Sequence, residues 1–175
     1  MFKIIACINE SLVLGKDGKL IYTIGNDLSN FRRMTSYNGV VIMGRKTFET
    51  IHEPLQGRIN IIITSNKEFS VSDKFDNVYI ANSIDDAIEL CDAFFSDKEK
   101  FVIGGGAIYQ QFLERGLIDE MMLTIVRDNA DGDTYFPKID ENEWYVYYKS
   151  MAQVSSYQGV DKSFYFVILK KIKNS

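Results

Sequence analysis

The stretch that decides the fold lies near the N-terminus, at Phe2-Lys3-Ile4-Ile5-Ala6-Cys7-Ile8. It is almost continuously apolar, which predicts a strand buried on both faces, as in a mostly parallel sheet. Further short apolar segments, which predict more strands, follow at 40–43, 60–64, 78–81 and 101–103. Apolar residues at helical spacing predict helices at 26–34, from about 46, at 83–91 and at 107–114. This alternation of strands and helices indicates a doubly wound, parallel sheet.

The C-terminal part of the chain has a different pattern. Segments 120–126, 144–150 and 164–170 have the composition of strands, and no helical pattern separates them. Antiparallel strands added at one edge of the sheet fit this pattern. The predicted fold class is therefore α/β, with a doubly wound, mostly parallel central sheet, antiparallel C-terminal strands and flanking helices. Because no repeat, low-complexity segment or linker interrupts the sequence, residues 1–175 are expected to form a single domain.

The composition argues against several classes of protein. Hydrophobic residues make up 46% of the chain and charged residues 25%, which are ordinary values for a folded domain. The net charge of −4 argues against a general nucleic-acid partner, since such proteins usually carry a basic excess. No apolar run reaches the ~18 residues of a membrane-spanning helix, and the N-terminus lacks the pattern of a secretory signal. We therefore expect a cytoplasmic protein without a membrane partner.

The few histidine and cysteine residues limit the available chemistry. His52 is the one histidine, and Cys7 and Cys91 are the two cysteines. Both cysteines lie in apolar patterns, which indicates buried free thiols in a reducing compartment. These three residues cannot complete a zinc site, so no metal is expected. A serine-histidine-aspartate triad is disfavoured because no G-x-S-x-G motif occurs.

Glycine-bearing turns follow three of the predicted strands, at Gly15, at Gly44 and at 104–106. Ligands bind open α/β sheets at the carboxyl ends of the strands, where helix N-termini offer free N–H groups to phosphates. The triple glycine matches neither G-x-G-x-x-G nor the P-loop pattern, so a tight connection competes with a ligand site there. Residues 44–47, Gly-Arg-Lys-Thr, place two cations and a hydroxyl at such a turn. This suits an extra phosphate such as the 2′-phosphate of NADPH, although a solvated helix start is equally consistent with it.

Asp27 is the most informative single residue. It lies in the first turn of the predicted helix at 26–34, beside Leu28 and Phe31, which have the spacing of core-facing residues. Gly25 or Asn26 is expected to cap this helix. An aspartate at a helix N-terminus usually serves only to complement the helix dipole, and the local sequence alone favours that interpretation over a functional acid.

Several segments, taken together and in order, resemble the dihydrofolate reductase family over about residues 2–170. The matching segments are IIAC at 4–7 with Gly15, DLSNFRRMT at 27–35, VIMGRKTFETI at 41–51, PLQGRINIIITS at 54–65, FVIGGGAIYQQF at 101–112, Leu123-Thr124 and GDTYFP at 132–137. Each segment is weak alone, but the common order and spacing make the resemblance specific. It implies NADPH-dependent reduction of 7,8-dihydrofolate to tetrahydrofolate.

The resemblance implies a role for each matching residue. Asp27 corresponds to the acid that hydrogen-bonds the pterin ring, Thr124 to the hydroxyl that supports this acid, and Arg58 to the arginine that binds the α-carboxylate of the glutamate tail. The apolar walls of the substrate site would be Ile5, Cys7, Leu28, Phe31, Ile51, Leu55 and Ile103. The NADPH contacts would be Cys7, Leu14, Gly15, Leu20, Gly44, Arg45, Lys46, Thr47, Thr64, Ser65, Gly104, Gly105, Gly106 and Tyr109. The family also has a cis peptide bond between the first two glycines of the triplet.

The chain departs from the family pattern at several positions. Ile21-Tyr22 replaces a Pro-Trp pair whose tryptophan helps to order a water beside the pterin, so Tyr22 is expected to take over that catalytic role with altered geometry. Glu53 stands where a basic residue often lies near the glutamate tail. Ala107 and Lys46 replace residues that are often basic and often histidine, respectively. The core set of site residues is retained.

Two alternatives share parts of this pattern. A pyrimidine reductase of riboflavin synthesis has the same fold and also uses NADPH, but it requires neither the aspartate after the loop nor the Arg58 clamp. A non-catalytic folate- or NADPH-binding module would bind NADPH without oxidising it. We expect a monomer that binds dihydrofolate and antifolates, with residues 9–24 as a lid over the cofactor.

Overall fold

A computed structural model of the chain describes residues 1–36 and 39–173. The elements, in chain order, are β1 (Phe2–Asn9), β2 (Val13–Lys16), β3 (Lys19–Leu20), α1 (Gly25–Thr35), β4 (Val40–Gly44), α2 (Arg45–Ile51), β5 (Ile59–Ile63), β6 (Val78–Ala81), α3 (Ile84–Phe94), β7 (Lys100–Gly104), α4 (Gly106–Glu114), β8 (Ile118–Val126), β9 (Thr134–Tyr135), β10 (Trp144–Lys149), β11 (Gln153–Tyr157) and β12 (Val160–Lys171).

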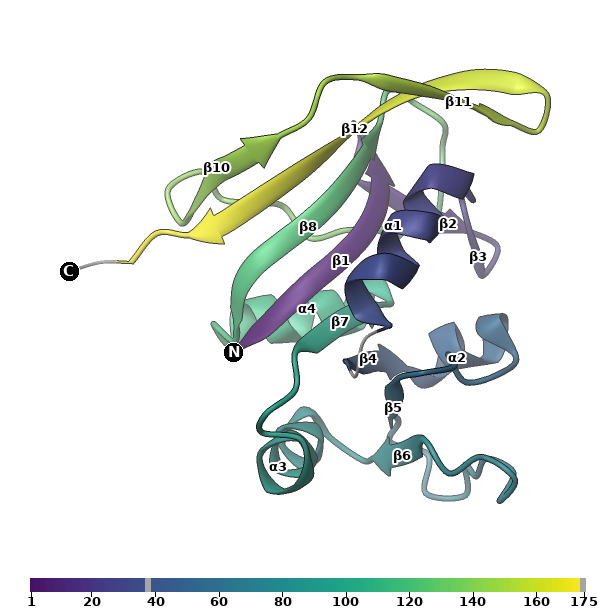
Figure 1. Cartoon of the computed structure of the whole chain (residues 1–175), viewed down its shortest axis with the longest axis vertical. Coiled ribbons are helices and arrows are strands. Elements are labelled where there is room, and N and C mark those ends of the chain that lie inside the picture. Colours follow the sequence, from purple (N-terminus) through teal and green to yellow (C-terminus); the bar gives the residue numbers. More distant parts are fainter. Residues whose placement is uncertain (37–38, 174–175) are drawn as a thin grey trace.

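One large twisted sheet organises the molecule, with strand order β10-β12-β8-β1-β7-β4-β5-β6 and β11 paired to β12 (Figure 1). Strand β1 runs parallel to both β7 and β8, and β4 runs parallel to both β7 and β5. Strand β12 is antiparallel to β8, β10 and β11. The predicted class is confirmed: a mostly parallel, doubly wound sheet with antiparallel C-terminal strands.

Strand β8 corrects one detail of the prediction. Segment 120–126 was expected among the antiparallel C-terminal strands, but β8 pairs in parallel with β1. The reason is the preceding helix α4, which carries the chain from the end of β7 back across the sheet, as in any β-α-β unit. Only β10, β11 and β12 form the antiparallel part, and β11 was missed because Gln153–Tyr157 is short, polar and half exposed.

A second, small sheet with the order β3-β2-β9 was also not predicted. Its strands lie within the loop expected at 9–24 and within GDTYFP, and two of them contain only two residues each. Such short strands have no detectable period in the sequence. The small sheet turns the N-terminal loop into an ordered element that lies over the carboxyl end of β1.

The two faces of the large sheet carry separate apolar clusters. Alternate residues of β4 show the division, because Val40 and Ile42 join one cluster, while Val41 and Met43 join the other. Side chains of α3 and α4 complete the first cluster, and Phe48 of α2 belongs to the second. In Figure 1, α1 lies in front of β1 and α4 lies behind it. The side of β1 that faces α1 is only partly buried, and this is where the candidate site lies.

Candidate active site

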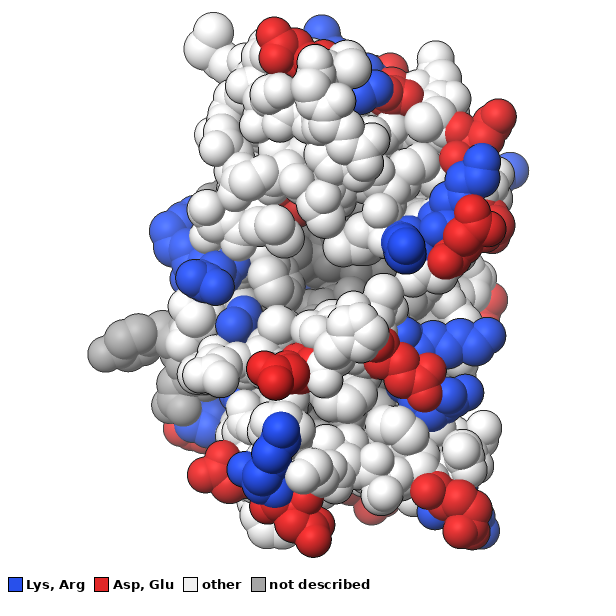
Figure 2. All heavy atoms as spheres, turned by 90° about the vertical axis from the view of Figure 1, so that its right-hand side faces the viewer, with Lys and Arg blue, Asp and Glu red and all other residues white. Residues whose placement is uncertain are grey.

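The candidate site lies where the carboxyl ends of β1, β4 and β7 meet the N-termini of α1, α2 and α4. Figure 2 shows the face with α1 and α2; it is hollowed across its middle, with few charged atoms inside and lysine and arginine side chains on both rims. This is the position expected for a ligand in an open α/β sheet. Among the described residues, no group of three or more His, Cys, Asp or Glu side chains is arranged to hold a metal ion.

Asp27 lies in the first turn of α1 and is bound from the sheet. The hydroxyl of Thr124, which is buried on β8, donates a hydrogen bond to Asp27 Oδ1. Burial raises the pKa of Asp27, while the hydrogen bond from Thr124 lowers it. The expected caps Gly25 and Asn26 are not caps: α1 begins after Ile24, and no side chain of the described chain caps it. The carboxylate of Asp27 is therefore held by tertiary structure.

Four of the predicted apolar wall residues belong to one cluster on the sheet. Ile5, Ile51, Leu55 and Ile103 are half-buried and pack on one cluster, on the face of the sheet that bears α2. Cys7 is adjacent, since Asp27 is the second cause, after burial, of its raised pKa.

Two further predicted wall residues lie on α1. Phe31 is half-buried and lies next to Arg58, whereas Leu28 is 46% exposed. Of the predicted wall residues, four thus share one apolar cluster, while Cys7 lies close to Asp27 and Phe31 lies beside Arg58.

Arg58 is a buried cation at one end of this hollow. It is only 8% exposed; its Nε donates to the Gln56 carbonyl at 3.0 Å and its Nη1 to Thr35 Oγ1 at 3.0 Å. Burial lowers the pKa of the guanidinium, with a further contribution from Arg32. Because these two hydrogen bonds fix its plane, the guanidinium can meet a carboxylate without first losing side-chain freedom.

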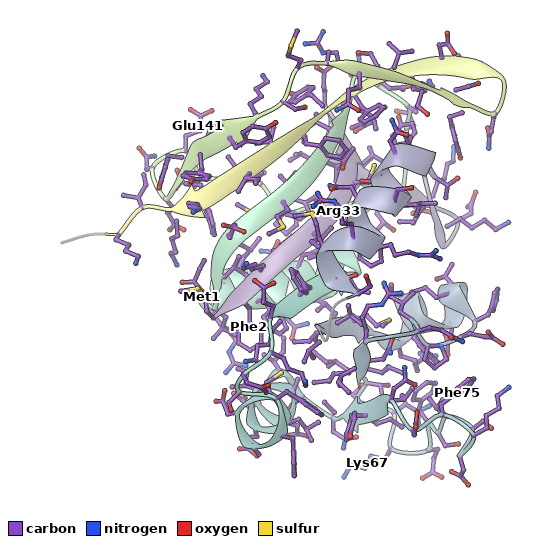
Figure 3. The ribbon with its side chains drawn as sticks, in the orientation of Figure 1. Met1, Phe2, Arg33, Lys67, Phe75 and Glu141 are labelled. Atoms are coloured by element: carbon purple, nitrogen blue, oxygen red, sulfur yellow. The ribbon has the colours of Figure 1, made fainter. Side chains whose placement is uncertain are left out.

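A cavity of about 940 Å³ adjoins Arg58. Glu53, Lys74 and Phe75 are among its lining residues. Figure 3 labels Phe75 on the loop between β5 and β6, below α2 in that view. Glu53, which replaces a basic residue of the family, therefore lines the same cavity as Arg58. Lys74 is a second cationic side chain that lines this cavity.

The two glycine turns touch each other. Gly44 precedes α2 and Gly105 precedes α4. A Cβ atom added at Gly44 would lie 3.1 Å from the Ile108 side chain, and one added at Gly105 would lie 3.3 Å from Thr47 Oγ1. The peptide bond between Gly104 and Gly105 is cis, as the resemblance implied. The N-termini of α2 and α4 therefore converge on one place, which suits a diphosphate.

Tyr109 connects this turn to β1. Its hydroxyl donates to the Ile5 carbonyl at 2.7 Å, and its ring packs on Phe136 with the ring centroids 5.1 Å apart. Burial raises the pKa of Tyr109, and Asp27 and then Cys7 add to this. The contact fixes the glycine turn against the strand that carries two of the predicted wall residues.

The basic residues predicted for a phosphate lie at the start of α2. Arg45 Nη1 forms an ion pair with Glu49 Oε1 at 2.5 Å, and Lys46 is exposed. Thr64 is buried at the end of β5, where its hydroxyl accepts from the Asn66 amide at 3.1 Å, and Ser65 is exposed beside it.

The small sheet lies over the glycine turn. Leu14 and Gly15 are buried, and Leu20 is 56% exposed. The amide of Asp17 donates to Asp133 Oδ2 at 2.7 Å, and the Asp133 amide donates to the Gly15 carbonyl at 3.1 Å. In the sequence, GDTYFP serves only as a family marker, and nothing in it predicts that Asp133 binds the loop. The one sequence feature that could have indicated this contact is an acidic residue, Asp133, in a turn-like segment that also contains glycine and proline.

Tyr22, the residue expected to replace the family tryptophan, is buried. Its hydroxyl has no hydrogen-bond partner among the described residues. Burial and the nearby Asp128 carboxylate raise the pKa of Tyr22 to about 12, and the side chain of Asn9 acts against this. Tyr22 does not contribute to the shift of the Asp27 pKa. Tyr22 belongs to an apolar cluster with Ile24, against which Cys7 also packs.

This fold and site define an α/β protein built to hold a phosphate-bearing ligand beside a buried acid. A sequence profile described as dihydrofolate reductase matches residues 1–171. The chain is 35% identical over 171 residues to the dihydrofolate reductase of Buchnera aphidicola, with 97% of each chain covered. It is 33% identical to that of Bacillus subtilis, over 91% of this chain and 84% of the relative. The chain therefore belongs to the dihydrofolate reductase family.

Other relatives are longer. The bifunctional dihydrofolate reductase-thymidylate synthase of Daucus carota is 32% identical over 89% of this chain, which spans only 31% of that protein. Among solved structures, the dihydrofolate reductase of Enterococcus faecalis, complexed with NADP(H) and RAB-propyl, matches with a TM-score of 0.82 and 26% identity, over 99% of this chain and 97% of the other. The likeness therefore extends over the whole fold.

Proposed function

We propose that this chain is an NADPH-dependent dihydrofolate reductase. The reaction is 7,8-dihydrofolate plus NADPH and a proton, giving tetrahydrofolate and NADP⁺. The observation that carries the proposal is the carboxyl group of Asp27, which is largely buried, accepts a hydrogen bond from Thr124 and lies close enough to Tyr109, beside the glycine turn, to raise its pKa. Asp27 would bind the pterin, and Arg58 would bind the α-carboxylate of the glutamate tail.

The residues at the glycine turns fit the cofactor. Gly44, Gly105 and Gly106 lie at the N-termini of two helices, and a side chain at Gly106 would come within 2.8 Å of the Tyr135 carbonyl. Arg45, Lys46, Thr47, Thr64 and Ser65 would hold the phosphates and adenosine ribose. Leu14, Gly15, Leu20 and Tyr109, with Cys7, would surround the nicotinamide. NADPH supplies the hydride; the protein positions the two rings in contact, which makes the transfer effectively unimolecular.

The role proposed for Asp27 follows from its surroundings. A carboxylate among apolar groups interacts strongly with a cation, so ionised Asp27 favours a pterin that is protonated at N5. A protonated pterin accepts hydride more readily. The proton itself can arrive through a water beside Leu20 and Tyr22.

We further propose that the protein acts as a single-domain monomer in the cytoplasm and binds antifolates at the same site. In the described part of the chain, no helix has the length and apolar character needed to cross a membrane. The exposed acidic and basic residues are mixed over the face shown in Figure 2, which does not favour a nucleic-acid partner.

The test is an NADPH-oxidation assay with and without dihydrofolate. We expect oxidation only when dihydrofolate is present, with tetrahydrofolate as the product. Binding of NADPH without oxidation would indicate a non-catalytic module. Oxidation with a pyrimidine precursor of riboflavin, but not with dihydrofolate, would indicate the pyrimidine reductase.

A further inference from the structure

The loop that carries Arg58 is bound at two of its backbone carbonyls. Between α2 and β5 the chain turns at Gly57, whose φ is +72°. The carbonyls of Leu55 and Arg58 lie on either side of this turn. Each of them accepts hydrogen bonds from two side chains, those of Asn60 and Asn77. The two asparagines therefore fix the backbone on both sides of the turn.

Asn60 is the inner of the two asparagines. It is fully buried on β5. Its Nδ2 donates to the Leu55 carbonyl at 3.0 Å and to the Arg58 carbonyl at 3.1 Å, and its Oδ1 accepts from the Leu55 amide at 2.9 Å. Because one side chain pairs with three backbone groups, replacing it would leave buried polar groups without partners. Asn60 is therefore needed for the fold itself.

Asn77 is the outer asparagine, half-buried directly before β6. Its Nδ2 donates to the Arg58 carbonyl at 3.0 Å and to the Leu55 carbonyl at 3.3 Å. Its own carbonyl accepts from the Asn60 backbone amide at 2.8 Å, where β5 and β6 begin to pair. Asn77 also lines the cavity of about 940 Å³ that Arg58 lines. Its side-chain amide thus connects a fixed strand to the backbone of the buried arginine.

The guanidinium of Arg58 is held by the same turn and by α1. Its Nε donates to the Gln56 carbonyl at 3.0 Å, and its Nη1 donates to Thr35 Oγ1 at 3.0 Å. The Thr35 hydroxyl donates in turn to the Phe31 carbonyl at 2.8 Å. The Gln56 carbonyl lies between the two carbonyls that Asn77 binds. A shift of the turn would therefore move the arginine backbone and one acceptor of its guanidinium, while the acceptor on α1 stayed in place.

We propose that Asn77 is a positioning residue, which sets the plane of the Arg58 guanidinium for a carboxylate of the substrate's glutamate tail. Its two hydrogen bonds hold the turn where Nε meets the Gln56 carbonyl and Nη1 meets Thr35. A bidentate pair of guanidinium and carboxylate depends on orientation, so a small shift weakens binding of the tail and leaves the pterin end undisturbed. This role in substrate binding rests on the proposed reductase function.

The test compares the wild type, Asn77→Leu, Arg58→Leu and the double variant with two substrates. One is 7,8-dihydrofolate; the other is 7,8-dihydropteroyl methylamide, which keeps the pterin and the benzoyl amide but has no carboxylate. Asn77→Leu should raise the KM for dihydrofolate about 3- to 10-fold, the scale set by one or two hydrogen bonds, and change kcat less than ~2-fold. Its KM for the methylamide should change less than ~2-fold. The double variant should match Arg58→Leu within ~2-fold, because Asn77 acts through the arginine.

The matched control is Asn142→Leu, which removes an exposed amide that donates to Asp140 Oδ1 in the turn before β10. It should leave the constants for both substrates unchanged. Equal losses with both substrates in Asn77→Leu would show a general structural role and overturn the proposal. Effects that multiply in the double variant would also overturn it, because Asn77 would then act independently of Arg58. A KM for dihydrofolate as low as that of the control would refute it as well.

Ligand binding separates this proposal from the reductase assignment. Calorimetric titration with folate and with pteroyl methylamide requires no turnover. If the wild type does not reduce dihydrofolate, the reductase assignment fails, yet a loss of affinity in Asn77→Leu for folate alone still supports the positioning role. Equal affinities of the wild type and Asn77→Leu for folate, or no binding of folate by either, would overturn it.

Discussion

At the scale of single residues, Asp27 shows how a site can differ from its local sequence context. From the sequence around it, the acid is best explained by the helix dipole. The structure instead has the Thr124 hydroxyl, from β8, donating to its carboxylate within an apolar setting. Asp27 and Thr124 are far apart in the sequence, so only the resemblance to a family predicted that they interact. No local pattern could have done so, because the partner lies on another element.

The raised pKa of Asp27 makes a prediction about stability. Burial raises the pKa above the ~3.9 of an unfolded chain, so the stability linked to protonated Asp27 is fully present below that pH and is lost as the pH rises through the raised value. Ionised Asp27 therefore destabilises the native state near neutral pH. We expect Asp27→Asn to raise the Tm at neutral pH and to lose this advantage below a pH of about 4. Calorimetry at both pH values, with Asp73→Asn at an exposed site as control, measures it; a lower Tm at neutral pH would refute it.

Arg58 makes a prediction about binding. Its guanidinium is buried and fixed by Gln56 and Thr35, and it lines the large cavity. We expect Arg58→Leu to raise the KM for dihydrofolate by about 100-fold or more, because a charge-assisted pair contributes roughly 3 kcal/mol. The KM for NADPH should change by less than about 3-fold, within the additivity expected for separate sites. Steady-state kinetics with each substrate varied in turn decides, and equal effects on both constants would exclude the clamp.

At the scale of elements, the N-terminal loop is the part that sequence reasoning described least well. Residues 9–24 were expected as a loop that acts as a lid; the lid stays a prediction, but the segment includes β2 and β3, which pair with each other, and β2 also pairs with β9 far along the chain. Strands of two residues carry no periodic signal, and their pairing is set by contacts such as Asp17 with Asp133. The longer strands and all four helices found in the described residues were predictable because their apolar spacing repeats over several turns or residues.

Gly15 tests the role of this loop. A Cβ atom there would lie 2.6 Å from the Lys19 carbonyl across the β2–β3 pair, so the two strands would have to separate. We expect Gly15→Ala to raise the Kd for NADPH about 10-fold, because misplacing a covering loop loses contacts comparable to ~1.4 kcal/mol. Gly25→Ala, with open space around its Cβ, is the control. Fluorescence titration with NADPH measures both; equal affinities for the two variants would show that the loop does not cover the cofactor.

At the scale of the whole molecule, one sheet connects the two ends of the candidate site. Strand β8 lies between β1 and β12, so the antiparallel hairpin that contacts Tyr22 and the parallel strands that carry the glycine turns share one framework. The sequence predicted the parallel part well, because strands buried on both faces are strongly apolar. It misplaced β8 and missed β11, since strand pairing depends on the crossover helix and on contacts across the chain.

A single framework predicts cooperative unfolding. We expect one calorimetric transition, in line with the proposed single domain, and a rise in stability of about 2.7 kcal/mol when NADPH is present at 100 times its Kd. Differential scanning calorimetry with and without NADPH measures both quantities. Two separate transitions, only one of which responds to NADPH, would show that the sheet does not unfold as one unit.

The central claim is that Asp27 is the acid that binds the pterin and promotes its protonation. The most direct measurement is the turnover of Asp27→Asn with dihydrofolate and NADPH near neutral pH, compared with the wild type. We predict a loss of at least ~100-fold in kcat, with the fold and the Kd for NADPH retained. Turnover at the wild-type rate in that variant would contradict the account.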